Sequence, residues 1–109
     1  MSRQRIPEIT HLQFLVLGLL RQSGRLGRDL RRELARQGIK RTSPAFYQMM
    51  ARLEDGGLVS GEYDQKVVAG QMIKERRYVA TAAGASAWNS TRDFYLKHIG
   101  ALGGKTAHA

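Results

Sequence analysis

The sequence contains no cysteine, only two prolines and half as many acidic as basic residues. Without cysteine there are no disulfides and no thiolate metal sites, which is compatible with a reducing cytoplasm, where we expect the protein to act. The longest apolar run, Phe14 to Leu20, falls far short of the roughly 20 residues that cross a bilayer, so we expect no membrane partner. We also expect no signal peptide, because Pro7 and Glu8 follow the basic Arg3 and Arg5.

Positive charge is the most unusual property that the chain does have. Its 18 Lys and Arg against 9 Asp and Glu give a formal net charge of +9 over 109 residues. Such a field favours polyanions, either nucleic acid or an anionic membrane surface, and no membrane anchor accompanies it. The length predicts one domain with a single core. Nucleic acid is therefore the favoured class of partner.

Apolar spacing predicts two helices in the first forty residues. The first begins after its N-cap Thr10 and ends near Gln22. Its apolar residues form more than one stripe, which predicts burial on most sides, partly against a second subunit: Leu12, Phe14, Leu15, Val16, Leu17, Leu19 and Leu20. The second runs from about Leu26 to Gln37, with one leucine stripe. Its arginines are interpreted either as a solvated face or as phosphate contacts.

A third helix is predicted from Ser43, as N-cap, with Pro44 at the first helical position, to the Gly56–Gly57 pair. Its buried stripe has helical spacing: Phe46, Met49, Met50 and Leu53. The opposite side then presents residues able to read base edges or hold phosphates: Tyr47, Gln48 and Arg52. This helix is the candidate for DNA recognition.

The pattern changes to strands after this helix. Leu58–Tyr63 and Arg76–Ala80 are predicted to pair, with a polar, glycine-bearing loop from Asp64 to Lys74 between them. The loop carries Lys66 and Lys74, so its tip is expected along a DNA backbone or in a minor groove, and a merely solvated loop is the alternative. A basic hairpin that follows three helices predicts a winged helix-turn-helix, mainly α with a small β-hairpin.

A last helix is predicted from Thr81 or Ala82 to about Ile99, with Trp88, Tyr95 and Ile99 near one face. One small domain does not bury both Trp88 and Tyr95, so a dimer partner is expected, with core packing of Trp88 as the alternative. The predicted organisation is a basic arm over residues 1–8, the winged domain over 9–81, a dimerisation helix over 82–99 and a flexible tail over 100–109.

Taken in order, these segments resemble the PadR family of bacterial transcriptional repressors. The first helix, HLQFLVLGLL, resembles that family's lLLGLL opening, and LGRDL is similar to its HGYEI segment without the tyrosine and histidine. TSPAFY lines up with SxGTLY, and RLEDGGLV with RLExxGLV. KERRYVATAAG matches the RKYYxLTxxG wing and helix start. The resemblance covers about residues 9 to 100. No single motif is specific to the family, but all of them together in this order are.

The resemblance implies a homodimeric DNA-binding repressor. Tyr47 stands at the family's recognition-helix tyrosine, which contacts the DNA backbone, and Thr42 and Ser43 stand where the helix N-terminus approaches a phosphate. Arg76 and Arg77 occupy the basic pair of the wing. Pro44 and Ala45 replace the family's Gly-Thr, which removes a hydroxyl that could reach DNA.

The short C-terminal helix resembles a subfamily in which the first and last helices build the dimer. That pairing makes six residues candidates for a dimer or ligand interface: Leu12, Leu15, Leu19, Trp88, Tyr95 and Ile99. Some relatives stack flat aromatic effectors between those helices. Trp88 and Tyr95 are the candidates for such a contact here, with a core or interface role as the alternative.

Catalysis has little support in the sequence. His11, His98 and His108 share no metal-binding spacing, and no nucleophile with a matching base is identifiable, so we expect no enzyme, no cofactor and no metal. Two other functions stay open for a winged helix of this charge, namely RNA binding and a protein–protein interaction module. Most of the seven aromatic residues fall at core or interface positions, which disfavours stacking on unpaired RNA bases.

Overall fold

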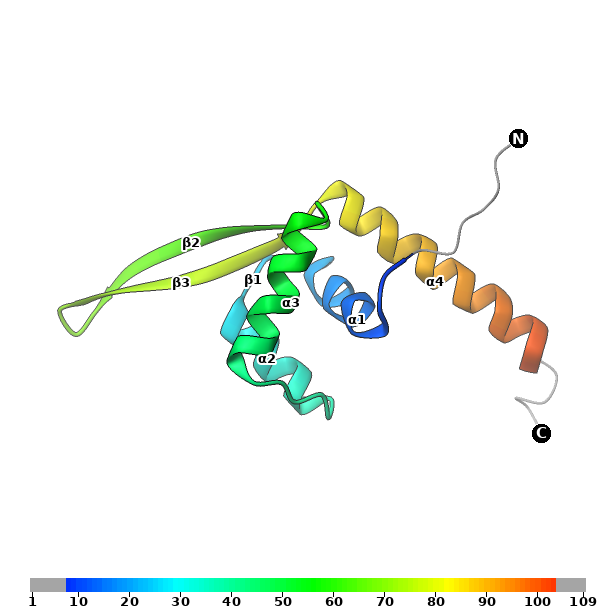
Figure 1. Cartoon of the computed structure of the whole chain (residues 1–109), viewed down its shortest axis with the longest axis horizontal. Coiled ribbons are helices and arrows are strands. Elements are labelled where there is room, and N and C mark those ends of the chain that lie inside the picture. Colours follow the sequence, from blue (N-terminus) through cyan, green and yellow to red (C-terminus); the bar gives the residue numbers. More distant parts are fainter. Residues whose placement is uncertain (1–7, 104–109) are drawn as a thin grey trace.

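The structure, a computed structural model, describes residues 8–103 and confirms a mainly α protein with a β wing. Its elements follow one another as α1 (His11–Leu20), β1 (Arg25–Leu26), α2 (Gly27–Arg36), α3 (Ser43–Asp55), β2 (Val59–Val68), β3 (Gln71–Ala80) and α4 (Ala82–Gly103). The sheet is antiparallel with the order β1-β3-β2. Figure 1 shows the β2–β3 wing and α4 extending to opposite sides of a body made by the first three helices.

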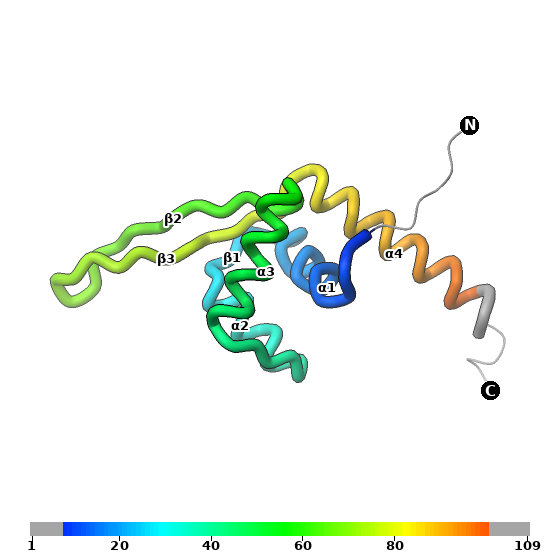
Figure 2. Tube along the Cα trace, viewed as in Figure 1, coloured from blue at the N-terminus to red at the C-terminus, as the bar shows by residue number. Residues whose placement is uncertain are grey.

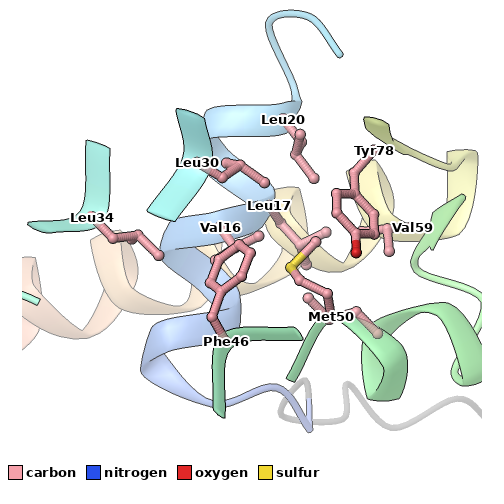
Figure 3. Packing of buried hydrophobic residues seen from close by; sticks show 10 residues of the cluster. Val16, Leu17, Leu20, Leu30, Leu34, Phe46, Met50, Val59 and Tyr78 are labelled. Atoms are coloured by element: carbon pink, nitrogen blue, oxygen red, sulfur yellow. The ribbon is translucent and has the colours of Figure 1, made fainter. Parts of the chain in front are cut away.

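The core lies where α1, α2, α3 and the base of the sheet meet. Its buried side chains repeat at helical spacing in each helix: Val16, Leu17, Leu20, Leu30, Leu34, Phe46, Met50, Leu53, Val59 and Tyr78. Figure 3 shows the Phe46 and Met50 side chains of α3 and Tyr78 of β3 gathered around α1. Met49, expected in the stripe, is only partly buried beside this cluster. The core therefore fixes α3 with its opposite face outward.

The start of α3 differs by one residue from the prediction. Thr42, not Ser43, is the N-cap: it has extended backbone, and its hydroxyl accepts a hydrogen bond from the amide of Ala45 at 3.3 Å. Ser43 is then the first helical residue and Pro44 the second. Proline is tolerated throughout the first helical turn, and threonine and serine both cap helices, so the sequence did not distinguish the two positions.

The wing is longer and more regular than predicted. The expected loop from Asp64 to Lys74 is wrong, because β2 and β3 stay paired out to Val68 and Gln71. Only Ala69 and Gly70 form the turn, with φ angles of 53° and 80°. Two residues with positive φ are typical of the tight hairpin turns whose twist suits antiparallel strands. The short strand β1, which pairs with β3, was not predicted at all.

Helix α4 begins at a tight junction and runs further than expected. The hydroxyl of Thr81 donates to the carbonyl of Gly57 at 2.6 Å and accepts from the amide of Gly84 at 3.0 Å. The helix continues to Gly103 instead of ending near Ile99, so the first four residues of the predicted tail are helical. The remainder of the tail and residues 1–7 of the predicted arm lie outside the described residues. Figure 2 shows the C-terminal half of α4 projecting beyond α1.

Between residues 8 and 103, no helix is long and apolar enough to cross a membrane. Within the same range, no group of three or more histidine, aspartate and glutamate side chains is arranged to hold a metal ion.

Candidate nucleic-acid interface

The exposed face of α3 carries the residues that the sequence singled out for recognition. Gln48 lies at the centre of this face, opposite the buried Phe46 and Met50. Tyr47 and Arg52 lie on its two sides: Tyr47 lines a cavity toward the wing, and Arg52 lines a smaller groove toward α1. Thr42 and Ser43, at the start of the helix, are exposed as well. One helix thus presents an amide, a guanidinium and a phenol over a broad surface.

Tyr47 is held in place by a close contact with α2. A Cβ atom at Gly27 would lie 2.8 Å from both Cε1 and the hydroxyl oxygen of Tyr47, so only glycine leaves room for the ring. Tyr47 also packs edge-on against Phe46, with 5.0 Å between the ring centroids. The ring remains 36% exposed. The glycine matches the family pattern in sequence, but its packing against Tyr47 is evident only from the structure.

Arg76 connects the wing to α3. Its Nη2 atom lies 2.7 Å and 3.0 Å from the two carboxylate oxygens of Glu54, and its guanidinium lies 4.7 Å from the centroid of the Tyr63 ring. The hydrogen bond that Arg76 donates to the Glu54 carboxylate raises the pKa of Arg76 further above its already high value. Gly61 leaves space for this pair, because a Cβ atom there would lie 2.9 Å from Nε of Arg76. Sequence reasoning predicted Arg76 as a backbone contact and missed Glu54.

The four cations predicted on the wing are divided between its two faces. Strand alternation puts Lys74 and Arg76 on the face toward α3, and Lys66 and Arg77 on the other. Arg77 pairs with Asp64 at 2.8 Å, and Lys66 approaches Glu75 at 3.5 Å. The Arg77–Asp64 pair is exposed on both sides, so it is worth little and Arg77 can exchange Asp64 for another anion, whereas the Glu75 side chain that Lys66 approaches is only 16% exposed.

A cavity of about 770 Å³ separates α3 from the wing. Its lining combines cationic, acidic and aromatic side chains: Arg28, Tyr47, Ala51, Glu54, Tyr63, Lys74, Glu75, Arg76 and Tyr78. Lys74 and Tyr47, predicted separately from the wing and the helix, therefore lie on the same concave surface. The structure brings these two residues together and places Lys66 and Arg77 on the opposite side of the wing.

Tyr78 at the base of this cavity should titrate later than an exposed tyrosine. Burial raises the pKa of its phenol, and the carboxylate of Glu54 adds to the rise. A phenol whose pKa is higher in the folded state adds to the free energy of unfolding. This contribution is fully present below about pH 10 and is lost as the pH rises through the pKa of the folded state. We expect tyrosinate absorbance to show one late-titrating group among the four tyrosines. Its disappearance in Tyr78→Phe would assign it, and an unchanged titration would contradict the burial argument.

The residues predicted for a dimer or ligand interface fall into two groups. Trp88 packs within the chain: its ring stacks on Phe14 with centroids 5.5 Å apart, and the guanidinium of Arg21 lies 4.1 Å from its centroid. Leu12, Leu15 and Leu19 are partly buried beside the same core. Tyr95 packs edge-on against the same Phe14 ring, with centroids 6.2 Å apart, yet remains 47% exposed, and Ile99 is 62% exposed further along α4.

Comparisons with known proteins identify the architecture. No protein-family model matches the sequence, and no curated protein matches it. Among solved structures, a PadR family transcriptional regulator from Eggerthella lenta is 27% identical, with a TM-score of 0.67 over 84% of this chain and 78% of its own. A PadR-like transcription factor from Bacteroides fragilis is 16% identical, with a TM-score of 0.70 over 84% of this chain and 85% of its own.

Bacillus subtilis PadR, solved in complex with operator DNA, is 19% identical with a TM-score of 0.59. The match covers 79% of this chain but 47% of that longer one. The order of helices and strands, the wing that follows α3 and these similarities agree with one another. The chain has a winged helix-turn-helix fold and is similar to PadR-family transcriptional regulators.

Proposed function

We propose that the protein is a sequence-specific, double-stranded DNA-binding transcriptional repressor that acts as a homodimer. The observation that carries the proposal is the exposed face of α3, with Gln48 at its centre and Lys74 of the wing beside it. The net charge of +9 supplies the long-range attraction to a polyanion. The likeness to Bacillus subtilis PadR, which binds operator DNA, supports the same partner for this chain.

In this proposal α3 enters the major groove. Gln48 and Arg52 donate hydrogen bonds to base edges, a role suited to an amide and a guanidinium. Tyr47 and the first turn of α3, with Thr42 and Ser43, contact backbone phosphates. Lys66, Lys74 and Arg77 of the wing contact the flanking backbone. Arg76, engaged by Glu54, acts as a positioning residue that holds the wing at its angle to α3.

The dimer would form through α1 and α4. Tyr95 and Ile99 offer exposed apolar surface on the C-terminal half of α4, and a second copy would cover it. Two recognition helices would then read half-sites about one helical turn apart, roughly 34 Å. Bound across a promoter, such a dimer blocks transcription. A flat aromatic effector that stacked near Trp88 or Tyr95 would change the spacing of the two recognition helices.

Selection from a random duplex library tests this function. We expect enrichment of an inverted repeat with half-sites spaced by about one helical turn. Gln48→Ala should relax the preference at one base pair per half-site and weaken binding to the selected duplex about tenfold, within the 1–3 kcal/mol of a good base contact. Gln37→Ala, an exposed glutamine at the end of α2, is the matched control and should change neither.

The alternatives give different results in the same selection. Stronger binding to hairpin RNA than to any duplex would favour an RNA-binding winged helix. If no duplex sequence were enriched and no duplex bound at low salt, the protein–protein interaction module would be the favoured function. If Gln48→Ala left the base preference unchanged, the proposal that α3 recognises base edges would be contradicted.

A further inference from the structure

A second concave surface lies along α2, next to the α3–wing cavity. It is a groove of about 370 Å³ between α2 and the loop that leads to α3. Apart from Ala35, every residue that lines it is cationic: Arg28, Arg31, Arg32, Lys40 and Arg41. We call it the arginine groove. None of its lining residues is acidic, in contrast to the α3–wing cavity, which includes Glu54 and Glu75.

The arginine groove has an ordered wall. Nε of Arg31 donates to the carbonyl oxygen of Arg41 at 2.9 Å, which joins α2 to the loop. Because this bond uses Nε, the two terminal nitrogens of the Arg31 guanidinium remain available to donate to an oxyanion. Arg28 and Arg32 form ion pairs with Glu75 at 3.1 Å and Asp29 at 3.4 Å, with arginine side chains 54% and 60% exposed. The Arg32–Asp29 pair is exposed on both sides, so it contributes little and exchanges readily for a stronger anion, whereas Glu75, with a side chain only 16% exposed, holds Arg28 on the side toward the wing.

Five positive charges around one groove repel one another, and attraction to an anion that lies among them offsets this repulsion. The arrangement is also extended: Arg28 and Arg32 are four residues apart, which is about 6 Å along a helix axis. The phosphates of one DNA strand advance about 3.4 Å along the duplex axis per nucleotide. A row of this length fits more than one phosphate of a strand better than a single small anion.

The position of the groove indicates which polyanion it binds. Arg28 lines both the arginine groove and the α3–wing cavity, so the two surfaces are continuous. At the other end, Arg41 directly precedes Thr42 and the first turn of α3, whose free amide groups favour negative charge. A DNA strand that contacts α3 in the proposed complex would therefore also lie along α2.

We propose that the arginine groove binds backbone phosphates of the DNA strand that flanks the α3 contact, an inference that rests on the proposed DNA binding. The site extends the footprint beyond the recognition helix and the wing. Its contribution is independent of base sequence, because phosphates carry none. It therefore raises affinity for every duplex and steepens the dependence of binding on salt concentration.

The test compares the double variant Arg32→Gln/Arg41→Gln with the double control Arg36→Gln/Lys97→Gln, which removes the same charge from exposed positions outside the groove. Arg31 is kept in both, so its bond to the loop persists. Fluorescence anisotropy with a labelled duplex gives affinity at several salt concentrations. In the groove variant we expect the salt slope to become shallower by about one unit per lost phosphate contact per subunit.

We also expect the groove variant to bind every duplex at least about tenfold more weakly at moderate salt, with its base preference unchanged. A salt slope equal to that of the control would overturn the arginine groove while leaving DNA binding by α3 intact. If the wild-type protein binds no duplex at all, both the groove and the proposed function fail. A midpoint temperature of thermal unfolding equal to that of the wild type shows that each variant retains the fold.

Discussion

Replacing Tyr95 and Ile99 with aspartate is expected to convert the protein from a dimer to a monomer. Both side chains lie in the C-terminal half of α4 and are exposed, at 47% and 62% of their surface, although one edge of Tyr95 packs against Phe14 of α1. A second copy would bury them, and a carboxylate in that apolar contact would lose its water without gaining a partner. Light scattering should show the mass fall from about 24 kDa, twice 12.2 kDa, to that of one chain.

Loss of the dimer should weaken DNA binding more than loss of any single contact. Two linked recognition helices gain about 10²–10⁴ in affinity over one, so we expect the aspartate variant to bind the selected inverted repeat at least about 100-fold more weakly. Asn89→Asp/Ser90→Asp adds the same charge at exposed positions of α4 and should leave mass and affinity near wild type. Equal losses in the two variants would mean that negative charge on α4 acts through electrostatics alone.

Phe46→Ala should produce the largest loss of stability among substitutions in α3. Phe46 is fully buried, and its ring is one of the largest enclosed side chains of the core. Truncation of such a ring removes its transfer free energy and leaves a cavity, which together cost about 3–5 kcal/mol. That is a large fraction of the roughly 5–15 kcal/mol that holds a typical domain folded. Urea unfolding should show the midpoint shift without a matching change in slope.

Tyr47→Ala is the matched control, since it truncates an aromatic ring at the next position of the same helix. Its ring is 36% exposed, so we expect a much smaller loss of stability together with weaker DNA binding. Phe46→Leu, which keeps most of the apolar volume, should lie between wild type and Phe46→Ala. If Phe46→Ala and Tyr47→Ala were equally destabilised, the assignment of buried and exposed faces on α3 would be wrong.

The helices were predictable because their signals are local. Thr10 caps α1, and its hydroxyl accepts from the amide of Gln13 as the spacing suggested. Leu30 and Leu34 are four residues apart and buried as expected. The end of α4 was misjudged because Gly100 suggests a helix end, whereas the helix continues through it.

The wing was harder to predict because its signal is not local. Beyond Tyr63 both faces of β2 and β3 are largely exposed, so their residues show no clear alternation of apolar and polar side chains. The strands form through pairing with each other, as in the register that sets Gln65 opposite Lys74. A search for residues with positive φ fails as well, since Ala69 is an uncommon residue for that conformation.

The candidate site was only partly readable for the same reason. Tyr47, Gln48 and Arg52 were found because helical spacing separates them from a buried stripe. The contact of Arg76 with Glu54 joins residues 22 positions apart, and it depends on the sheet register and the packing of α3 on β2. The arginine groove likewise requires the loop after α2 to fold back along that helix.

The most direct test of the account is anisotropy of a labelled duplex titrated with wild-type protein across several salt concentrations, with the mass measured by light scattering in the same buffer. We expect a dimer of about 24 kDa, twice the 12.2 kDa chain, that binds the duplex with a steep negative salt slope. A monomer, or a protein that ignores duplex DNA at low salt, would contradict it.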